Sequence, residues 1–286
     1  MKPQNFNGVM PKISVIIAVF NGTKTIERTL ASLRAQTFKD FEVVIKDAQS
    51  NDGTMDIVAQ FADLPGARIV GKDGGIFDAW NQAVQAAKGE WLCFLGADDY
   101  LWDANVLAHF ATKLDGAYPK HRYVYGVERI VSETGRILES FGEPWDKVGH
   151  RQRYENVVPH RGMMHHRTMF TDNGLFDTSF RIAGDYEFLR RELLTRPPLF
   201  IPDFEVVGGL WGGVSTRSDY VVKTALETKR AVDKQERINL ILPSYWKVTK
   251  AYIKYYIRML MGEGAMRSVA NTYRRLTGRP SRGTDY

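Results

Sequence analysis

The sequence predicts an α/β protein built on an open, mostly parallel sheet with helices on its faces. Short apolar runs alternate with helix-like segments between residues 13 and 95, a rhythm typical of parallel strands joined by crossover helices. The chain has 286 residues, of which 44% are hydrophobic and 25% charged, as in an ordinary globular protein. One large domain with an appended segment is therefore the expected organisation.

The first predicted strand, ISVIIAVF (residues 13–20), is too continuously apolar to be half exposed, so we expect it to be covered on both faces. The following segment places Ile26, Leu30 and Leu33 on one face of a helix. The same alternation continues as strand 41–47, helix 55–62, strand 67–70, helix 75–87 and strand 90–95.

The second half of the chain is less regular. Strand-like runs occur at 121–131 and 135–140, a helix is expected at 185–194, and residues 219–261 read as mainly helical with a break at Pro243. From Arg217 onward there are 15 Lys and Arg residues against six Asp and Glu, a net charge of +9 in a chain whose total is +6. We therefore place a boundary between residues 216 and 217, with a basic helical extension after it.

The single cysteine, Cys93, has no partner for an intrachain disulfide, which suits a reducing compartment such as the cytosol. The N-terminal residues lack the apolar core of a signal peptide, and the sequence has no uninterrupted apolar span near the roughly 20 residues that cross a bilayer. We therefore expect a cytoplasmic protein that does not span the membrane.

Polar residues follow three of the predicted strands. Asn21 comes after the first, Asp47 ends the second, and Asp98 and Asp99 follow the fourth. In an open parallel sheet, ligands bind beyond the carboxyl ends of the strands, so these side chains are expected to meet in one crevice. Mg²⁺ or Mn²⁺ shares oxygen ligands between one or two carboxylates and phosphates. The adjacent aspartates therefore indicate a divalent cation on a nucleotide diphosphate, although acidic pairs are also common in turns.

Two stretches carry a resemblance to a known family. Residues 11–58, beginning PKISVIIAVFNGTKT, and residues 72–99, KDGGIFDAWNQAVQAAKGEWLCFLGADD, resemble the nucleotide-sugar-binding half of family 2 glycosyltransferases, which have the GT-A fold. The resemblance is close over residues 11–105 and looser to residue 216. It implies a catalytic domain at 1–216, with a donor-binding half at 11–105 and an acceptor half at 106–216, followed by the basic region 217–286.

The resemblance also implies a set of donor-binding positions, which share a place beside the nucleobase, ribose or diphosphate: Ala18, Phe20, Asn21, Asp47, Asp73, Gly75 and Asn81. Asp47 matches the aspartate that accepts a hydrogen bond from the base, and Phe20 is a possible ring flanking it. Three of these residues also fit purely structural roles, because Asn21 could simply form a turn, Asp73 could be a solvent-facing loop charge, and Asn81 could lie on a helix surface.

The metal motif of the resembling family is usually Asp-any-Asp, and this sequence departs from it. Gly96 occupies the first position and Asp98 the second, so the resemblance implies Asp98 as the ligand of the metal or diphosphate, with Asp99 as a helper. Arg217, in WGGVSTR, is a candidate for neutralising the diphosphate, with plain surface charge as the alternative.

FRIAGDYEFLRREL (residues 180–193) resembles the second acidic motif of the family, which supplies the general base in inverting members. Asp185 is the matching position, and Glu187 is the reserve. A base lowers the barrier to attack by an alcohol, whose own nucleophilicity is poor near neutral pH. The alternative is that Asp185 only stabilises a helix N-terminus.

PHRGMMHHRTMF (residues 159–170) contains His160, His165 and His166, but their spacing matches no zinc pattern, and no cysteine accompanies them. Structural or substrate-lining roles are therefore expected for these histidines. In the resembling family, a His at the Pro-His position precedes the acceptor side of the site, which makes His160 and Arg161 further candidates there.

In YWKVTKAYIKYYIRMLM (residues 245–261), four basic residues fall on one helical face and a largely aromatic set on the other. The basic set is Lys247, Lys250, Lys254 and Arg258, and the apolar set is Tyr252, Ile253, Tyr256 and Leu260. Such a helix fits adsorption to an anionic membrane surface, and it would equally suit packing on the main domain. No nucleic-acid-binding motif accompanies the charge.

Together these features predict an inverting glycosyltransferase that moves one sugar from a nucleoside-diphosphate sugar, with UDP favoured over GDP and dTDP. The resembling family's processive synthases have transmembrane helices and a Gln-any-any-Arg-Trp motif, and neither is present in this sequence. The basic tail favours a lipid-linked saccharide acceptor of a bacterial surface polysaccharide, such as a lipopolysaccharide or exopolysaccharide, at the inner membrane face. A nucleotidyltransferase and a non-catalytic, membrane-associated assembly factor remain the alternatives, and the oligomeric state is open.

Overall fold

A computed structural model describes residues 10–132, 134–210 and 220–236, together with parts of the C-terminal region: residues 245, 246, 248–253, 255, 256, 259, 260 and 272. The strands and helices run in the order β1 (Ile13–Val19), α1 (Ile26–Arg34), β2 (Phe41–Asp47), α2 (Thr54–Ala59), β3 (Arg68–Val70), α3 (Ile76–Ala86), β4 (Trp91–Gly96), β5 (Asp99–Leu101), α4 (Val106–Ala117), β6 (Tyr123–Val131), β7 (Ile137–Phe141), α5 (Trp145–Val148), the 3₁₀ turn η1 (Gly149–Arg151), β8 (Met164–His166), α6 (Thr168–Asp172), α7 (Gly184–Leu193), β9 (Leu199–Leu210) and α8 (Val221–Gln235).

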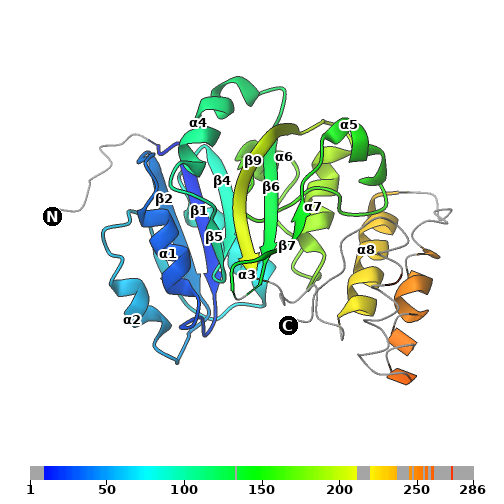
Figure 1. The fold of residues 1–286 in the computed structure, drawn as a ribbon, viewed down its shortest axis with the longest axis horizontal. Helices are drawn as coiled ribbons and strands as arrows, with labels where there is room; N and C mark the ends of the chain where they lie inside the picture. The colour runs from blue at the N-terminus through cyan, green and yellow to red at the C-terminus, as the bar shows by residue number, and fades with distance from the viewer. Residues whose placement is uncertain are drawn as a thin grey trace.

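Within these ranges the strands form one nine-stranded sheet in the order β3-β2-β1-β4-β8-β6-β9-β5, with β7 added on β6. The first four strands in that order are parallel, as predicted. Beyond β4 the sheet becomes mixed, because β8 pairs antiparallel with both β4 and β6, while β6 and β9 are parallel. The parallel character that we expected of most of the sheet is therefore confined mainly to the N-terminal half. Figure 1 shows helices lying on both sides of the strands.

The central strand β1 is buried along almost its whole length, and so are its neighbours β2 and β4. This confirms the prediction of a strand covered on both faces for residues 13–19, whereas Phe20, which we placed in the same strand, lies beyond its end and is exposed. Helix α1 buries Ile26, Leu30 and Leu33 against the sheet, which are the three residues that marked its apolar face in the sequence.

The register of β1 fixes where the functional residues lie. Val19 pairs with Asp47 of β2 on one side, and Ala18 pairs with Gly96 of β4 on the other. Neighbouring strands are about 4.8 Å apart, so the backbones of Asp47 and Gly96 are separated by roughly 10 Å. The polar residues that end three separate strands are thus brought to one edge of the sheet.

Helix α8 packs beside α7 (Figure 1). Lys234 of α8 donates to Glu187 at 2.9 Å, and Arg190 of α7 donates to Gln235 at 2.7 Å and to Glu236 at 2.8 Å. The predicted boundary after residue 216 therefore falls before a helix that packs against the preceding domain rather than before a detached tail.

Gly66 offers a test of how closely the loop before β3 approaches β2. Its φ is +131°, and an added Cβ would overlap the Val43 carbonyl oxygen and lie 2.7 Å from the Val43 amide nitrogen. We expect Gly66→Ala to lower the free energy of unfolding by about 2 kcal/mol or more, because it combines backbone strain with overlap against a rigid strand. Urea unfolding followed by circular dichroism measures the change.

The matched control is Gly116→Ala in α4, where an added Cβ meets nothing within 4 Å. There alanine should leave stability unchanged or raise it by up to about 1 kcal/mol, since glycine is a poor helix former. Equal unfolding midpoints for the two variants would contradict this description of the loop.

Candidate active site

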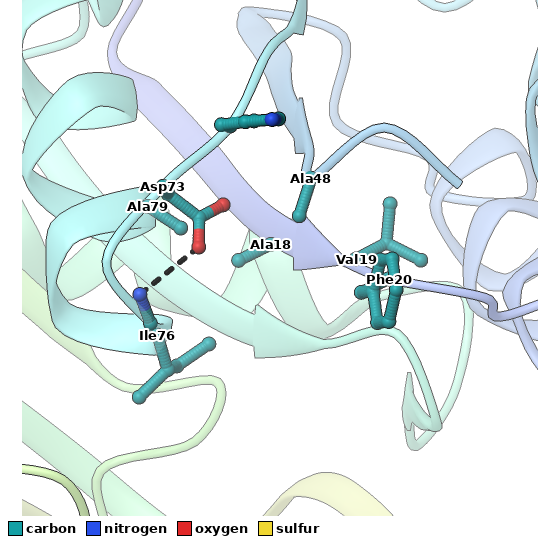
Figure 2. Close-up of a pocket in the computed structure, with 9 residues that line it drawn as sticks. Ala18, Val19, Phe20, Ala48, Asp73, Ile76 and Ala79 are labelled. Atoms are coloured by element: carbon teal, nitrogen blue, oxygen red, sulfur yellow. Dashed lines mark hydrogen bonds between the residues drawn. The ribbon is translucent and has the colours of Figure 1, made fainter.

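A cleft of about 500 Å³ lies at the carboxyl ends of β1 and β2 and the start of α3 (Figure 2). Its size is that of a site for one small molecule or cofactor. Its lining residues come from three segments of the chain: Ala18, Val19, Phe20, Ala48, Lys72, Asp73, Gly75, Ile76 and Ala79. Four of the predicted donor-binding positions, namely Ala18, Phe20, Asp73 and Gly75, are among them.

The rim of the cleft is apolar. Phe20 is 63% exposed and Ile76 is 40% exposed, and both line the cleft (Figure 2). Single exposed apolar side chains are common on protein surfaces, but these two line the same cleft. A flat ring inserted between these two side chains would bury both.

Asp47 ends β2 directly before Ala48, which lines the cleft. Its carboxylate is 1% exposed. Oδ2 accepts a hydrogen bond from the Ser50 amide at 3.0 Å, whereas Oδ1 has no partner among the described residues. Because buried polar atoms in proteins are almost always hydrogen-bonded, Oδ1 is an acceptor left open to water or to a ligand.

A buried lysine holds the loop on the opposite side of the cleft. Lys46 is fully buried, and its ammonium donates to Asp73 Oδ2 at 3.0 Å and to the Gly71 carbonyl at 2.5 Å. Asp73 Oδ1 in turn accepts from the Gly75 amide at 3.0 Å, the bond drawn in Figure 2. Asp73 therefore anchors its own loop and is not a solvent-facing charge.

Sequence reasoning did not single out Lys46. The sequence feature that could have identified it is a lysine near the end of the apolar run 41–47. Burying a charge there costs free energy unless the charge is paired, so a partner for Lys46 could have been expected.

Two predicted donor contacts have structural partners. Asn21 adopts a positive φ of 52°, and its Oδ1 accepts from the Asn51 amide at 3.1 Å, so it joins the loops that follow β1 and β2. Asn81 is buried in α3, where its amide donates to the Phe176 carbonyl at 2.9 Å and accepts from the Phe176 amide at 3.0 Å. Because both polar atoms are already paired inside the protein, Asn81 braces the core instead of making the donor contact that we expected.

The acidic pair divides into two roles. The Asp98 side chain is half-buried and accepts no hydrogen bond from the described residues, so its oxygens are available to a cation or a diphosphate. Asp99 is fully buried, with Oδ2 accepting from the Gly96 amide at 3.0 Å and Oδ1 paired with Arg161 at 2.8 Å. The structure thus makes Asp99 the partner of an arginine, and not the helper metal ligand that we expected.

The departure at Gly96 has a steric basis. An added Cβ would lie 2.6 Å from Asp99 Oδ2 and 2.7 Å from Asp98 Oδ1, closer than real Cβ atoms come to such atoms. A side chain at residue 96 would therefore have to displace both carboxylates.

Arg161 connects the strand end to the second half of the sheet. Its guanidinium also pairs with Glu128 of β6, which is itself buried. Burial raises the pKa of Asp99 to about 6 despite the opposing effect of the Arg161 charge. Of the two candidates in the Pro-His-Arg stretch, Arg161 is therefore the one that pairs with the acidic residues. His160 is buried against Phe94, with ring centroids 5.3 Å apart.

Asp185 lies in the first turn of α7 and belongs to the same charged neighbourhood. Its pKa is raised to about 6, chiefly by desolvation, with Glu128 raising it further and Arg161 lowering it. A carboxylate with this pKa is ionised near neutral pH yet basic enough to take a proton. Glu187, the reserve candidate, is fully buried and paired with Arg191 and Lys234, so its role is structural.

Two contacts hold the start of α7 against the donor side of the cleft. The Arg181 guanidinium donates to the carbonyl of Gly74, in the loop that lines the cleft. Gly184 lies against the ring of Phe77 in α3, where an added Cβ would come within 2.7 Å. The candidate base and the candidate donor cleft are thereby joined through α3. Arg217 and its loop lie outside the described residues.

The histidines do not form a metal centre. Burial lowers the pKa of His165 to about 3 and holds the pKa of His160 well below its usual value, so both are neutral. Across the part of the chain that the structure describes, no three His, Cys, Asp or Glu side chains gather as a cluster that could hold a metal ion. None of the helices in that part is long and apolar enough to span a membrane.

Comparison with known proteins extends these observations. The family model described as "Glycosyl transferase family 2" matches residues 14–184. A PGL/p-HBAD biosynthesis glycosyltransferase of Mycobacterium bovis is 29% identical over 245 residues, which cover 82% of this chain and 91% of the relative. An uncharacterized glycosyltransferase of Mycobacterium tuberculosis is 31% identical over 197 residues, covering 67% of this chain and 72% of the relative.

Solved structures agree on the fold. The mannosyltransferase PcManGT of Pyrobaculum calidifontis, in complex with GDP-Man and Mn²⁺, has a TM-score of 0.62 at 19% identity, covering 92% of this chain and 76% of that one. TarS of S. aureus in complex with UDP-GlcNAc has a TM-score of 0.57 at 18% identity, with 92% and 85% covered. The chain therefore belongs to glycosyl transferase family 2, as a glycosyltransferase enzyme with the GT-A fold.

Proposed function

We propose that this protein transfers a single sugar from a nucleoside-diphosphate sugar to a hydroxyl of a saccharide acceptor, with inversion at the anomeric carbon. The observation that supports this best is the clustering of three carboxylates around the carboxyl ends of β1, β2 and β4: Asp47, next to the cleft-lining Ala48 and with an unpaired buried oxygen, the half-exposed Asp98, and Asp185, whose pKa is raised. Such a transfer requires binding of the sugar donor, stabilisation of the leaving group and removal of the acceptor proton.

The donor base would lie between Phe20 and Ile76, with its N–H donating to Asp47 Oδ1. Asp47 Oδ1 accepts no bond from the described residues, whereas Oδ2 already accepts from the Ser50 amide. Uracil offers a single N–H on the edge that would face Asp47, which Oδ1 alone can accept. UDP is therefore the carrier that we propose.

A divalent cation, Mn²⁺ or Mg²⁺, would be held by Asp98 together with the donor diphosphate. The donor set suits such an ion, because one free carboxylate plus phosphate oxygens is a usual arrangement for it. When bound, the cation supplies positive charge that stabilises the departing nucleoside diphosphate. The nearby protein cation, Arg161, is tied to Asp99 and Glu128 and shapes the site around Asp98.

Asp185 would act as the general base. Its carboxylate takes the proton of the acceptor hydroxyl while that oxygen attacks the anomeric carbon, and the bond from this carbon to the diphosphate breaks on the opposite face. A single displacement of this kind inverts the anomeric centre. Desolvation is the main cause of the raised pKa of Asp185, and the smaller effects of Glu128 and Arg161 on that pKa oppose each other.

The acceptor is proposed to be a lipid-linked saccharide at the inner face of the cell membrane, in the assembly of a bacterial surface polysaccharide. Several aromatic and aliphatic side chains of the C-terminal region are exposed, including Trp246, Tyr252, Ile253, Tyr256 and Leu260. Ala251 between them is buried. Together with the basic residues of the sequence, such groups suit adsorption to anionic lipid.

The first prediction concerns the donor. Asp47→Asn should weaken UDP binding by about tenfold to a hundredfold, since it replaces a charge-assisted hydrogen bond in a buried site. Isothermal titration with UDP in the presence of Mn²⁺ measures this. Asp40→Asn, at the exposed start of the segment leading into β2, is the matched control and should bind normally.

The same titration examines the cation. Asp98→Asn should bind UDP with similar affinity whether Mn²⁺ or EDTA is present, whereas the unchanged protein should bind more tightly with Mn²⁺. Unaltered UDP affinity in Asp47→Asn would refute the proposed contact between Asp47 and the nucleobase. A full effect of manganese on UDP affinity in Asp98→Asn would refute Asp98 as the metal ligand.

The second prediction concerns proton transfer. Asp185→Asn should lower kcat by about a hundredfold or more while UDP affinity stays within about twofold. For the unchanged enzyme, kcat/KM should fall about tenfold per pH unit below pH 6, because the base must be deprotonated and its pKa is raised to about 6. Transfer rates on a panel of UDP-sugars and acceptors give both profiles. Normal turnover in Asp185→Asn would exclude it as the base. Transfer of a nucleotidyl group instead of a sugar by the unchanged enzyme would support the alternative of a nucleotidyltransferase.

The third prediction concerns the membrane. The full chain should float with vesicles that contain phosphatidylglycerol and remain unbound to pure phosphatidylcholine vesicles. Replacing Trp246, Tyr256 and Leu260 together by serine should abolish flotation, because membrane adsorption scales with buried apolar area. Leu226→Ser, at an exposed position of α8, is the control. Failure of the unchanged protein to float would refute the membrane proposal and leave the transfer proposal standing.

A further inference from the structure

The carboxylate of Glu227 lies among three consecutive backbone amides. Glu227 belongs to α8, and its oxygens accept hydrogen bonds from the amides of Arg181 at 2.9 Å and 3.1 Å, Ile182 at 2.8 Å and Ala183 at 2.9 Å. The segment 181–183 leads directly into α7. Glu227, more than 40 residues away in sequence, thus accepts hydrogen bonds from all three backbone amides of the segment 181–183.

These bonds satisfy the amide of the N-cap residue of α7 and the two amides before it. Ala183, the N-cap residue, has no side chain able to accept a hydrogen bond, and its own amide is one of the groups at a helix N-terminus that lack a partner within the helix. Carboxylates that accept from backbone amides at a helix N-terminus form strong bonds, because the amides and the helix dipole both favour negative charge there. Glu227 supplies that charge from a different helix.

The segment held by Glu227 has functional groups at both of its ends. On one side Arg181 donates to the carbonyl of Gly74 in the donor loop, and an added Cβ at Gly75 would lie 2.8 Å from the Arg181 guanidinium. On the other side, Asp185 follows Ala183 by two residues. Movement of residues 181–183 would therefore displace the candidate base relative to the donor cleft.

Glu227 is not needed to keep α8 in place. Lys234 pairs with Glu187 at 2.9 Å, and the Arg230 guanidinium lies 3.7 Å from the centroid of the Phe180 ring. Ala231 and Val232 are fully buried. Removing the Glu227 carboxylate should thus release the segment 181–183 locally without detaching the helix.

We propose that Glu227 is a positioning residue for the transfer reaction. Its carboxylate fixes residues 181–183, and through them it sets the place of Asp185 relative to the donor. The inference rests on the proposed function of Asp185 as the base. Glu227 lies outside residues 14–184, the part of the chain that matches the family model.

The test compares Glu227→Ala and Glu227→Gln with Asp233→Asn. Asp233 is the matched control because it is an exposed acid on the same helix that pairs with Lys229 one turn away. We expect Glu227→Ala to lower kcat by about tenfold to a hundredfold, the scale of loss when a reacting group is misplaced by about 1 Å. Glu227→Gln should lose less, since it keeps an oxygen that can accept. Asp233→Asn should match the unchanged enzyme.

The split between kcat and donor affinity separates positioning from general damage. The donor loop is also held by Lys46 and Asp73, so UDP affinity in both Glu227 variants should stay within about twofold. The stoichiometry of UDP binding gives the folded fraction, and rates are expressed per folded molecule. A kcat for Glu227→Ala within twofold of the unchanged enzyme would overturn the proposal.

Hydrogen exchange gives a readout that does not require turnover. The amides of residues 181–183 should exchange at least about tenfold faster in Glu227→Ala than in the unchanged protein or in Asp233→Asn. Unchanged exchange there would also overturn the proposal. If Asp185→Asn proves fully active, the base assignment fails, and the exchange rates still decide whether Glu227 holds the segment.

Discussion

The pairing of β1 between β2 and β4 is the constraint on which the rest of the site depends. Because Val19 lies opposite Asp47 and Ala18 opposite Gly96, the ends of three strands occur at one edge of the sheet. A shift of one residue in either register would turn the side chains at the strand ends to the other face. The buried apolar side chains of all three strands hold that register, and the cleft forms where the strands stop.

Much of this half of the fold could be predicted from sequence, since its strands are long apolar runs and its helices have clear apolar faces. The second half was harder for a physical reason. The strands β5 and β8 have three residues each, and β9 contains Pro202 and two adjacent glycines. Such segments become strands only because longer neighbours supply hydrogen-bond partners, so their local sequence carries little signal.

The site shows the same division. The positions of Asp47, Asp73 and Asp98 could be expected from the strand ends and the family resemblance. Their partners could not, because Arg161 and Asp99 are 62 residues apart and only the folded sheet brings them together. From the sequence we expected Asp99 to be a metal ligand, but in the structure it is buried as the counterion of Arg161. We expected Asn81 to contact the donor substrate, but its amide is hydrogen-bonded to Phe176. A residue type indicates a possible chemistry, and its neighbours decide whether that chemistry is used.

The hydrogen bonds between Glu227 of α8 and residues 181–183 also bear on where the catalytic domain ends. The match to the family model stops at residue 184, within the first turn of the helix that carries Asp185. The amides of residues 181–183, directly before this turn, donate to Glu227. The boundary of the family model and the boundary drawn by physical contact thus differ by more than 40 residues. Relatives that share the matched region could differ in how they secure this turn, and so in rate, while their recognisable motifs stay the same.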